Sequence, residues 1–151
     1  MNAGFSIREA TQNDLPLLLD LLRQCDLVTE GVLQSGTRYW VAESDVQQLI
    51  GLAGLEFGQD AVLLRSVGVH PDFQKRGIGT ALVKQTLTMA AKAGVRYAYC
   101  FSTDAQTYWA HSGFRKVSVT ELVDALPDAP QVIHFARIGW LPTEVAWRKD
   151  L

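Results

Sequence analysis

The chain has 151 residues, about the length of one ordinary domain, and 48% of them are hydrophobic, which is enough for a packed core. Its 14 Lys and Arg residues against 16 Asp and Glu residues give a net charge of -2, so no positive excess indicates nucleic acid or anionic lipid as a partner. The longest apolar runs fall far short of the roughly 20 residues that a membrane-spanning helix needs. We therefore predict a single domain over residues 1–151 that binds neither nucleic acid nor membrane.

The first residues and the cysteines indicate the cellular compartment. Arg8, Glu9 and Asp14 occupy positions where a secretory signal would place its apolar segment, so we expect a cytoplasmic protein. Cys25 and Cys100 are far apart and form no CxxC pair, and we interpret both as free thiols. The three histidines show no HExxH spacing, so no metal site is predicted.

The predicted elements begin with a short strand at residues 6–10. Thr11, followed three residues later by Asp14, is a capping-box signal that starts a helix, which we expect to end near Asp26. Leucines at helical spacing give this helix one apolar stripe, which must pack on another element, expected to be a sheet. Residues 27–36 lose the periodicity and are expected to form a loop or a poorly formed second helix that lines a site.

Three strands are predicted next. Residues 37–42 and 49–57 suit an antiparallel hairpin, and Gly51 and Gly54 in its second strand indicate a bulge or a close neighbour. Residues 61–69 are almost continuously apolar, which is typical of a strand buried on both faces in the middle of a sheet.

The second half of the chain alternates helices with strands. We expect a helix that ends near residue 92, then a strand at 95–101, a short helix at 104–112 and a strand at 114–119. Prolines interrupt the tail, in which we expect one helix and a last strand at residues 143–148. Early hairpins combined with one strand-helix-strand crossover place the chain in the α+β, or mixed α/β, class.

A glycine-containing turn between the buried strand and the next helix is the clearest chemical signal. The first N–H groups of a helix lack partners within the helix and attract anions. Gly77 and Gly79 would let such groups approach a phosphate closely, and Lys75 and Arg76 add positive charge. The alternative is a tight turn without a ligand. Neither GxxxxGK[ST] nor GxGxxG is present, so nucleotide hydrolysis and dinucleotide binding are disfavoured.

The residues around this turn resemble the Gcn5-related N-acetyltransferase (GNAT) family. The matching stretches are Val67-Gly68-Val69-His70-Pro71 before the turn, Gln74, Gly77 and Gly79 within it, and Tyr108-Trp109 and Gly113-Phe114 after it. The resemblance implies a mostly antiparallel, twisted sheet of about seven strands, splayed at the fourth strand and flanked by helices. It also implies acetyl-coenzyme A as cofactor, with its pyrophosphate at the turn and its pantetheine arm on the splayed strand. The cofactor-binding residues implied are Val67, Gly68, Val69, Gln74, Lys75, Arg76, Gly77, Ile78, Gly79, Thr80 and Ser102.

The family mechanism is direct attack of an amine on the thioester, and two positions here depart from the family pattern. Trp109 stands where many members place a tyrosine acid, and Leu63 stands where many place a glutamate base. Tyr108 is a candidate acid, although on a helix it would point about 100° away from its neighbour. Glu56 and Glu30 are candidates for proton uptake, with ordinary solvated carboxylates as the alternative.

Arg65 is a charged residue in an otherwise apolar strand, where a charge rarely lies without a partner. Two interpretations stay open: a structural ion pair, or recognition of an acidic acceptor such as an amino acid. Glu30 and Tyr39 are further candidates for the acceptor site, and Tyr39 has core packing as its alternative role.

A finer resemblance points to a small bacterial subgroup, the arsenic-resistance-associated N-acetyltransferases. It depends on Thr29-Glu30-Gly31, Gly54-Leu55-Glu56 and Leu64-Arg65-Ser66. We predict an acetyl-coenzyme A-dependent N-acetyltransferase that acetylates the amine of a small molecule, such as an amino acid or an acidic amine. The alternative is a non-catalytic acyl-coenzyme A sensor or interaction module of the same fold, and a homodimer is compatible with both.

Overall fold

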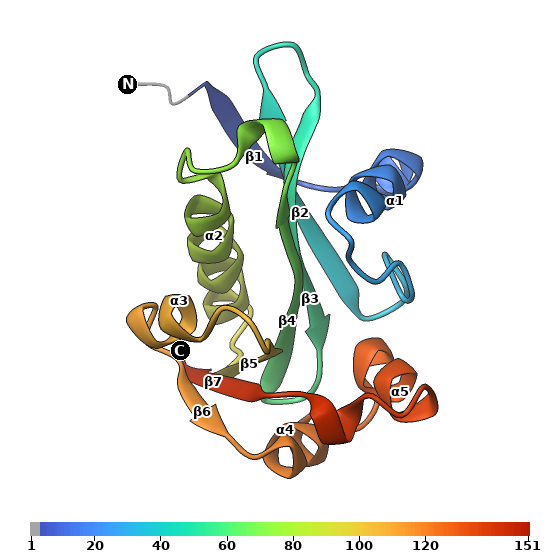
Figure 1. Cartoon of the computed structure of the whole chain (residues 1–151), viewed down its shortest axis with the longest axis vertical. Helices are drawn as coiled ribbons and strands as arrows, with labels where there is room; N and C mark the ends of the chain where they lie inside the picture. Colours follow the sequence, from blue (N-terminus) through green and yellow to red (C-terminus); the bar gives the residue numbers. More distant parts are fainter. Residues whose placement is uncertain (1–3) are drawn as a thin grey trace.

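The computed structural model describes residues 4–151 and is built around one sheet of seven strands (Figure 1). The spatial order is β1-β2-β3-β4-β5-β7-β6, and every neighbouring pair is antiparallel except β4 and β5. This arrangement confirms the predicted mixed α/β class and the mostly antiparallel sheet. The strands are β1 (Phe5–Glu9), β2 (Thr37–Ser44), β3 (Leu49–Phe57), β4 (Ala61–Val69), β5 (Tyr97–Phe101), β6 (Arg115–Val117) and β7 (Ala146–Asp150).

Helices cover both faces of the sheet. In Figure 1, α2 and α3 lie on one side of the strands, and α1 and α5 lie on the other. No helix within residues 4–151 combines the length and the apolar character needed to cross a membrane. The helices are α1 (Leu15–Gln24), α2 (Ile78–Lys92), α3 (Gln106–His111), α4 (Val119–Ala125) and α5 (Pro130–Arg137), with short 3₁₀ helices η1 (Gln12–Asp14), η2 (Pro71–Phe73) and η3 (Leu141–Thr143).

The capping box at the start of the first helical segment is confirmed. The backbone N–H of Thr11 donates to Oδ2 of Asp14 at 2.7 Å, which satisfies one of the donors left free at a helix start. Arg8 donates two further hydrogen bonds to the same carboxylate, each at 2.8 Å. These contacts hold the pKa of Asp14 down at about 2, with the Arg8 hydrogen bonds as the largest cause.

The tail contains two helices, α4 and α5, where the sequence predicted one. Ser118 starts α4, because its Oγ accepts the backbone N–H of Glu121 at 3.1 Å. Pro130 then occupies the first turn of α5, where a missing N–H costs nothing. The prolines at 127 and 130 therefore mark the boundary between two helices. Residues 27–36 form the loop that was one of the two predicted alternatives.

Alternate residues of a strand are buried on opposite faces of the sheet. Along β2, Trp40 and Ala42 pack on the α2 side, and Tyr39 and Val41 pack on the α1 side. The ring of Tyr39 lies directly over Gly54, where an added Cβ would come within 2.5 Å of it. A close neighbour therefore explains this glycine, as the sequence suggested.

A bulge and an early divergence distort β4, the strand that leads to the glycine turn. Its pairing with β5 covers only Ala61–Leu63 in the described chain, so the two strands separate beyond this point. On the other edge, Ser66 and Val67 both face Ala53 of β3, because the register shifts there. Ser66 takes a left-handed backbone conformation, with φ of 59°. After the bulge, Val67 packs on the α2 side, so it does not share the face of Arg65 and Leu63.

Candidate active site

The start of α2 forms a shallow depression of about 300 Å³. Gly77 precedes the helix with φ of 81°, a left-handed conformation that glycine adopts without strain. The N–H groups of the first helical residues have no carbonyl within the helix to bind, and α2 is long enough to have a substantial dipole. The lining residues are Val67, Val69, Phe73, Gln74, Lys75, Gly77, Ile78, Gly79, Thr80 and Tyr108.

Gly79 has space beside its backbone that the protein itself does not fill. Its backbone is helical, and an added Cβ would meet only Val69 Cγ2, at an ordinary contact distance of 3.6 Å. The protein itself would therefore accept alanine here without a clash. A glycine at this position makes physical sense if a bound group must approach the backbone closely.

The separated edge of β4 provides hydrogen-bonding groups for an extended ligand. Beyond Leu63 its backbone forms no ladder with β5 within residues 4–151, so polar groups on this edge are open to a peptide-like chain. Gln74 fixes the geometry nearby, because its Nε2 donates to the carbonyl of Val69 at 3.3 Å. Gly68 faces the other way, toward Cys25 and Leu27, where a Cβ would clash.

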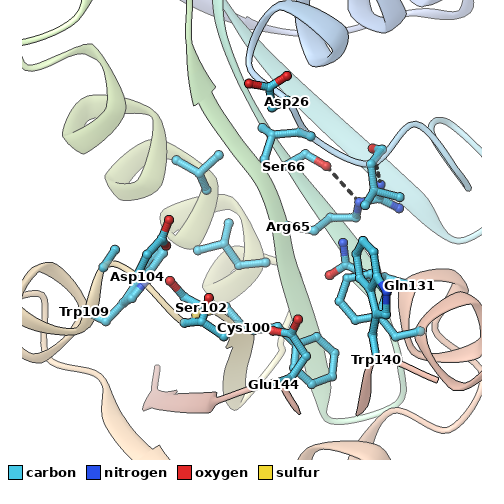
Figure 2. Close-up of a pocket in the computed structure, with 18 of the residues that line it drawn as sticks. Asp26, Arg65, Ser66, Cys100, Ser102, Asp104, Trp109, Gln131, Trp140 and Glu144 are labelled. Carbon is cyan, nitrogen blue, oxygen red and sulfur yellow. Dashed lines mark hydrogen bonds between the residues drawn. The ribbon is translucent and has the colours of Figure 1, made fainter. Parts of the chain in front are cut away.

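A larger cavity of about 460 Å³ opens where β4 and β5 diverge (Figure 2). Val67 and Tyr108 line both this cavity and the depression at α2, so the two spaces adjoin. The other walls come from the loop after α1, the end of β5, α3, α5 and the segment before β7. The side chains that these walls contribute include Asp26, Ser102, Asp104, Phe135, Trp140 and Glu144.

Most of the predicted cofactor residues come together in these spaces. Ser102 lies in the larger cavity, and the others lie in the depression, apart from two. Gly68 lines a neighbouring pocket with Cys25. Arg76 does not line the depression, and its guanidinium lies 5.2 Å from the centre of the Phe73 ring.

Arg65 and Glu56 form a buried ion pair, so neither is placed as predicted for a site residue. Nη1 of Arg65 donates to Oε2 of Glu56 at 2.8 Å, and the two side chains are 0% and 1% exposed. Oε1 of Glu56 accepts the backbone N–H of Gln131 at 2.9 Å, at the start of α5. Glu56 is therefore shielded from solvent, unlike both the base acting through water and the solvated carboxylate that the sequence suggested. The expectation of a water-linked base at this position is wrong in its geometry.

The remaining donors of Arg65 are also engaged. Nη1 and Nη2 donate to the carbonyls of Glu30 and Val28 at 2.6 and 3.0 Å, and Nε donates to Ser66 Oγ at 2.8 Å. The structural ion pair was the correct alternative, because a guanidinium without exposed surface cannot bind an acceptor. These contacts join the loop after α1, the bulge of β4, and α5, so Arg65 positions the walls of the cavity.

Two other predicted acceptor residues lie outside the cavity. The side chain of Glu30 is exposed and lines a separate depression beside α5, while only its carbonyl reaches Arg65. Tyr39 is 0% exposed, and its hydroxyl lies 3.0 Å from Ser66 Oγ. Burial raises the pKa of this phenol. Tyr39 therefore packs in the core, which was the alternative role stated for it.

Tyr108 and Trp109 have opposite surroundings on α3. Trp109 is 6% exposed and packs edge-on against Phe114, with ring centres 5.0 Å apart. Its indole N–H has no hydrogen-bond partner among the described residues. Tyr108 is half-buried and lines both the depression and the cavity, so it is better placed than the helical geometry suggested. Leu63 is fully buried on the opposite face, beside Tyr99.

The sequence analysis missed the carboxylates of the cavity and its aromatic rings on the α5 side. Glu144 follows η3, and its side chain points into the cavity in Figure 2. Partial burial raises the pKa of Glu144, and the charge of Asp104 adds to the effect. Phe135 and Trp140 pack with ring centres 5.2 Å apart and ring planes tilted by 54° on the α5 side. No local pattern marks these positions, because segments distant in sequence bring them together.

The comparison with protein families identifies the domain. The acetyltransferase (GNAT) domain model matches residues 35–116, more than half of the chain. The chain belongs to the GNAT acetyltransferase family. Acetyl-coenzyme A is the cofactor of this family, and the depression at α2 and the open edge of β4 suit its pyrophosphate and pantetheine groups. The resemblance inferred from the sequence is confirmed at the family level, and the arsenic-resistance subgroup stays a prediction.

Curated relatives are amino-acid acetyltransferases of greater length. The protein from Pasteurella multocida is 26% identical over 135 residues, which cover 82% of this chain and 30% of that protein. The protein from Yersinia enterocolitica is 24% identical over 144 residues, which cover 89% of this chain and 31% of that protein. The chain thus spans about a third of the length of these relatives.

Solved structures confirm the fold. N-acetylglutamate synthase from Neisseria gonorrhoeae, in complex with coenzyme A and N-acetyl-glutamate, aligns with a TM-score of 0.76 and 21% identity, over 100% of this chain and 36% of that one. A GNAT acetyltransferase from Staphylococcus aureus aligns with a TM-score of 0.75 and 16% identity, over 97% and 99%. The sheet splayed at β4 is therefore a GNAT fold.

Proposed function

We propose that this domain transfers the acetyl group of acetyl-coenzyme A to the amine of a small molecule. The observation that carries the proposal is the continuity of the two spaces, since Val67 and Tyr108 line both the depression at α2 and the cavity at the splay. A ligand whose phosphates lie at α2 can extend along β4 and present its end to the cavity. A cavity of about 460 Å³ suits a small acceptor.

The chemistry requires the protein to orient two reactants and to move protons. Acetyl-coenzyme A supplies a thioester carbonyl, which an amine attacks, and a thiol as leaving group. Backbone N–H groups on the open edge of β4 would stabilise negative charge on the carbonyl oxygen. Tyr108 lies where the depression meets the cavity, and its hydroxyl would donate a proton to the departing sulfur.

The relatives support a small amine as acceptor. The curated proteins that match are amino-acid acetyltransferases, and the Neisseria enzyme was solved with N-acetyl-glutamate. These proteins are longer than this chain and share little sequence identity with it. The acceptor of this chain is therefore inferred from the residues that line its own cavity.

Two measurements test the proposal. Calorimetry should show coenzyme A binding, and release of free thiol should accelerate when a primary amine is added to protein and acetyl-coenzyme A. Binding without turnover across a broad amine panel would support the non-catalytic acyl-coenzyme A module instead. Absence of coenzyme A binding by the folded protein would overturn both.

A further inference from the structure

The cavity presents negative charge to its contents. Its ionisable lining residues in the described chain are Asp26, Arg65, Cys100, Asp104, Tyr108 and Glu144. The one base among them, Arg65, is neutralised by Glu56 and has no exposed side-chain surface. The lining therefore contains three carboxylates, on the exposed residues Asp26 and Asp104 and on the half-buried Glu144, and no accessible cation among the described residues that line it.

Glu144 differs from the other buried or half-buried carboxylates of this fold. Glu56 and Asp14 each have an arginine partner, whereas Glu144 has no hydrogen bond or ion pair to its carboxylate within residues 4–151. The turn before it is fixed, because Thr143 Oγ1 donates to the carbonyl of Trp140 at 2.8 Å. Figure 2 shows this carboxylate pointing into the cavity. A partly desolvated carboxylate without a partner is costly, and such groups cluster at functional sites.

Aromatic rings form the adjoining walls. Phe135 and Trp140 come from the segment that also carries Glu144, and Tyr108 and Trp109 come from α3. Trp140 is 45% exposed, which is unusual for so large an apolar side chain. Faces of aromatic rings attract cations and cover apolar groups equally well. The walls therefore suit an ammonium group attached to an apolar body.

We propose that the acceptor is a cationic amine without a carboxylate group, and that Glu144 binds its ammonium and accepts a proton from it. This inference rests on the proposed function and specifies its substrate class. The ammonium gives one proton to the Glu144 carboxylate, which frees the nitrogen lone pair. The C–N bond then forms, the C–S bond breaks, and the second nitrogen proton reaches the thiolate through Tyr108 or water. The products are an amide, a thiol and one proton released by Glu144 to solvent.

The pH dependence of kcat/KM for the amine should depend on the protonation of Glu144. Burial and Asp104 raise its pKa above the usual glutamate value, which makes the carboxylate a stronger base. The other ionisable residues that line the cavity are Asp26, Asp104, Tyr108, Cys100 and Arg65, which is paired with Glu56. Burial raises the pKa of the Cys100 thiol, so it stays protonated. We expect kcat/KM for the amine to fall at acidic pH as Glu144 becomes protonated.

Matched acceptor pairs test the substrate class. Each pair consists of an amine and the amino acid that carries one additional α-carboxylate: tyramine and tyrosine, cadaverine and lysine, agmatine and arginine. For at least one pair, we expect the amine to have a kcat/KM at least about tenfold higher, because the carboxylates repel an acidic acceptor. Amino acids preferred in every pair that turns over would overturn this inference and leave the proposed function intact. No turnover with any compound, despite coenzyme A binding, would overturn both.

Glu144→Gln tests the role of the carboxylate. We expect kcat/KM for the amine to fall at least about a hundredfold, with the KM for acetyl-coenzyme A nearly unchanged and the acidic limb of the pH profile lost. Glu144→Asp should recover part of the activity and the acidic limb. Asp124→Asn, on the exposed side of α4, removes one negative charge elsewhere and should leave every parameter unchanged. A Glu144→Gln protein that keeps its activity and its acidic limb would overturn the assignment.

Discussion

Nη1 of Arg65 on β4 lies 2.8 Å from Oε2 of Glu56 on the neighbouring strand β3, and neither side chain has appreciable contact with solvent. Removing one member of a buried ion pair leaves an uncompensated charge. We expect Arg65→Met to lower the free energy of unfolding by about 3–5 kcal/mol, as measured by urea denaturation. Arg23→Met, which breaks an exposed pair with Asp20 on α1, should change stability little.

The double variant separates packing from charge. Glu56→Leu combined with Arg65→Met removes both charges, and it should be more stable than Arg65→Met alone. Its Gln131 N–H loses an acceptor, so full recovery is not expected. If Arg65→Met keeps wild-type stability and raises only the KM of an acidic acceptor, Arg65 recognises substrate after all.

Gly79→Ala separates ligand binding from folding. The added Cβ fits the protein, so we expect stability equal to or above that of the wild type by up to about 1 kcal/mol. The same Cβ would occupy the approach to the helix N–H groups, and coenzyme A affinity should fall at least about tenfold. Calorimetry measures the affinity, and thermal unfolding measures stability.

Gly94→Ala is the matched control for this change. Gly94 ends α2 with φ of 87° and lies outside the lining of the depression, so alanine there should reduce stability without altering affinity. Unchanged coenzyme A affinity in Gly79→Ala would remove the pyrophosphate from this end of α2.

The part of the site that sequence could predict is the part made by backbone. Gly77 marks the helix start directly, because its left-handed conformation favours glycine, and Gly79 leaves open space beside the first turn. The roles of side chains were harder to predict from sequence, because they depend on partners that are distant in the chain. Arg65 was correctly singled out as a charge needing a partner, but its partners come from β3 and from the loop after α1.

Glu144 illustrates what local patterns cannot show. It is one acidic residue in a tail interrupted by prolines, and only the path of α5 and η3 brings it to the splay of β4. The bulge at Ser66 had a similar effect, because a shift of one residue moved Val67 to the other face. Alternation along a strand predicts faces correctly only as far as the first bulge.

Tyr108→Phe and Trp109→Phe should have different consequences. If Tyr108 protonates the leaving sulfur, its loss should lower kcat by about tenfold to a hundredfold with little change in stability. A thiol has a reference pKa near ~8.5, so the thiolate can leave unassisted and some activity should remain. Trp109→Phe should keep turnover within roughly tenfold, because an indole donates no proton at useful pH.

Stability distinguishes the two variants further. Trp109 packs in the core, so its shortening to Phe should lower the free energy of unfolding by about 1–3 kcal/mol. Single-turnover thiol release and urea denaturation measure the two effects. The roles would be reversed if Trp109→Phe abolished turnover while acetyl-coenzyme A still bound.

The lowered pKa of Asp14 should make the stability of the fold depend on pH in the acidic range. Its pKa falls from 3.8 to about 2 in the folded protein, chiefly because Arg8 donates hydrogen bonds to it. A carboxylate with a lowered pKa stabilises the fold fully above its unfolded pKa, and that stabilisation is lost as the pH falls from about 4 toward 2.

Asp14→Asn removes the ion pair and weakens the cap, so we expect the free energy of unfolding to fall by about 1–2 kcal/mol at pH 7. The difference from wild type should shrink as the pH approaches 2, whereas Asp20→Asn, with its carboxylate 67% exposed, should show no such convergence. Urea denaturation at pH 7, 4, 3 and 2 measures this, and a difference that stays constant over the series would show that the charge of Asp14 does not contribute to stability.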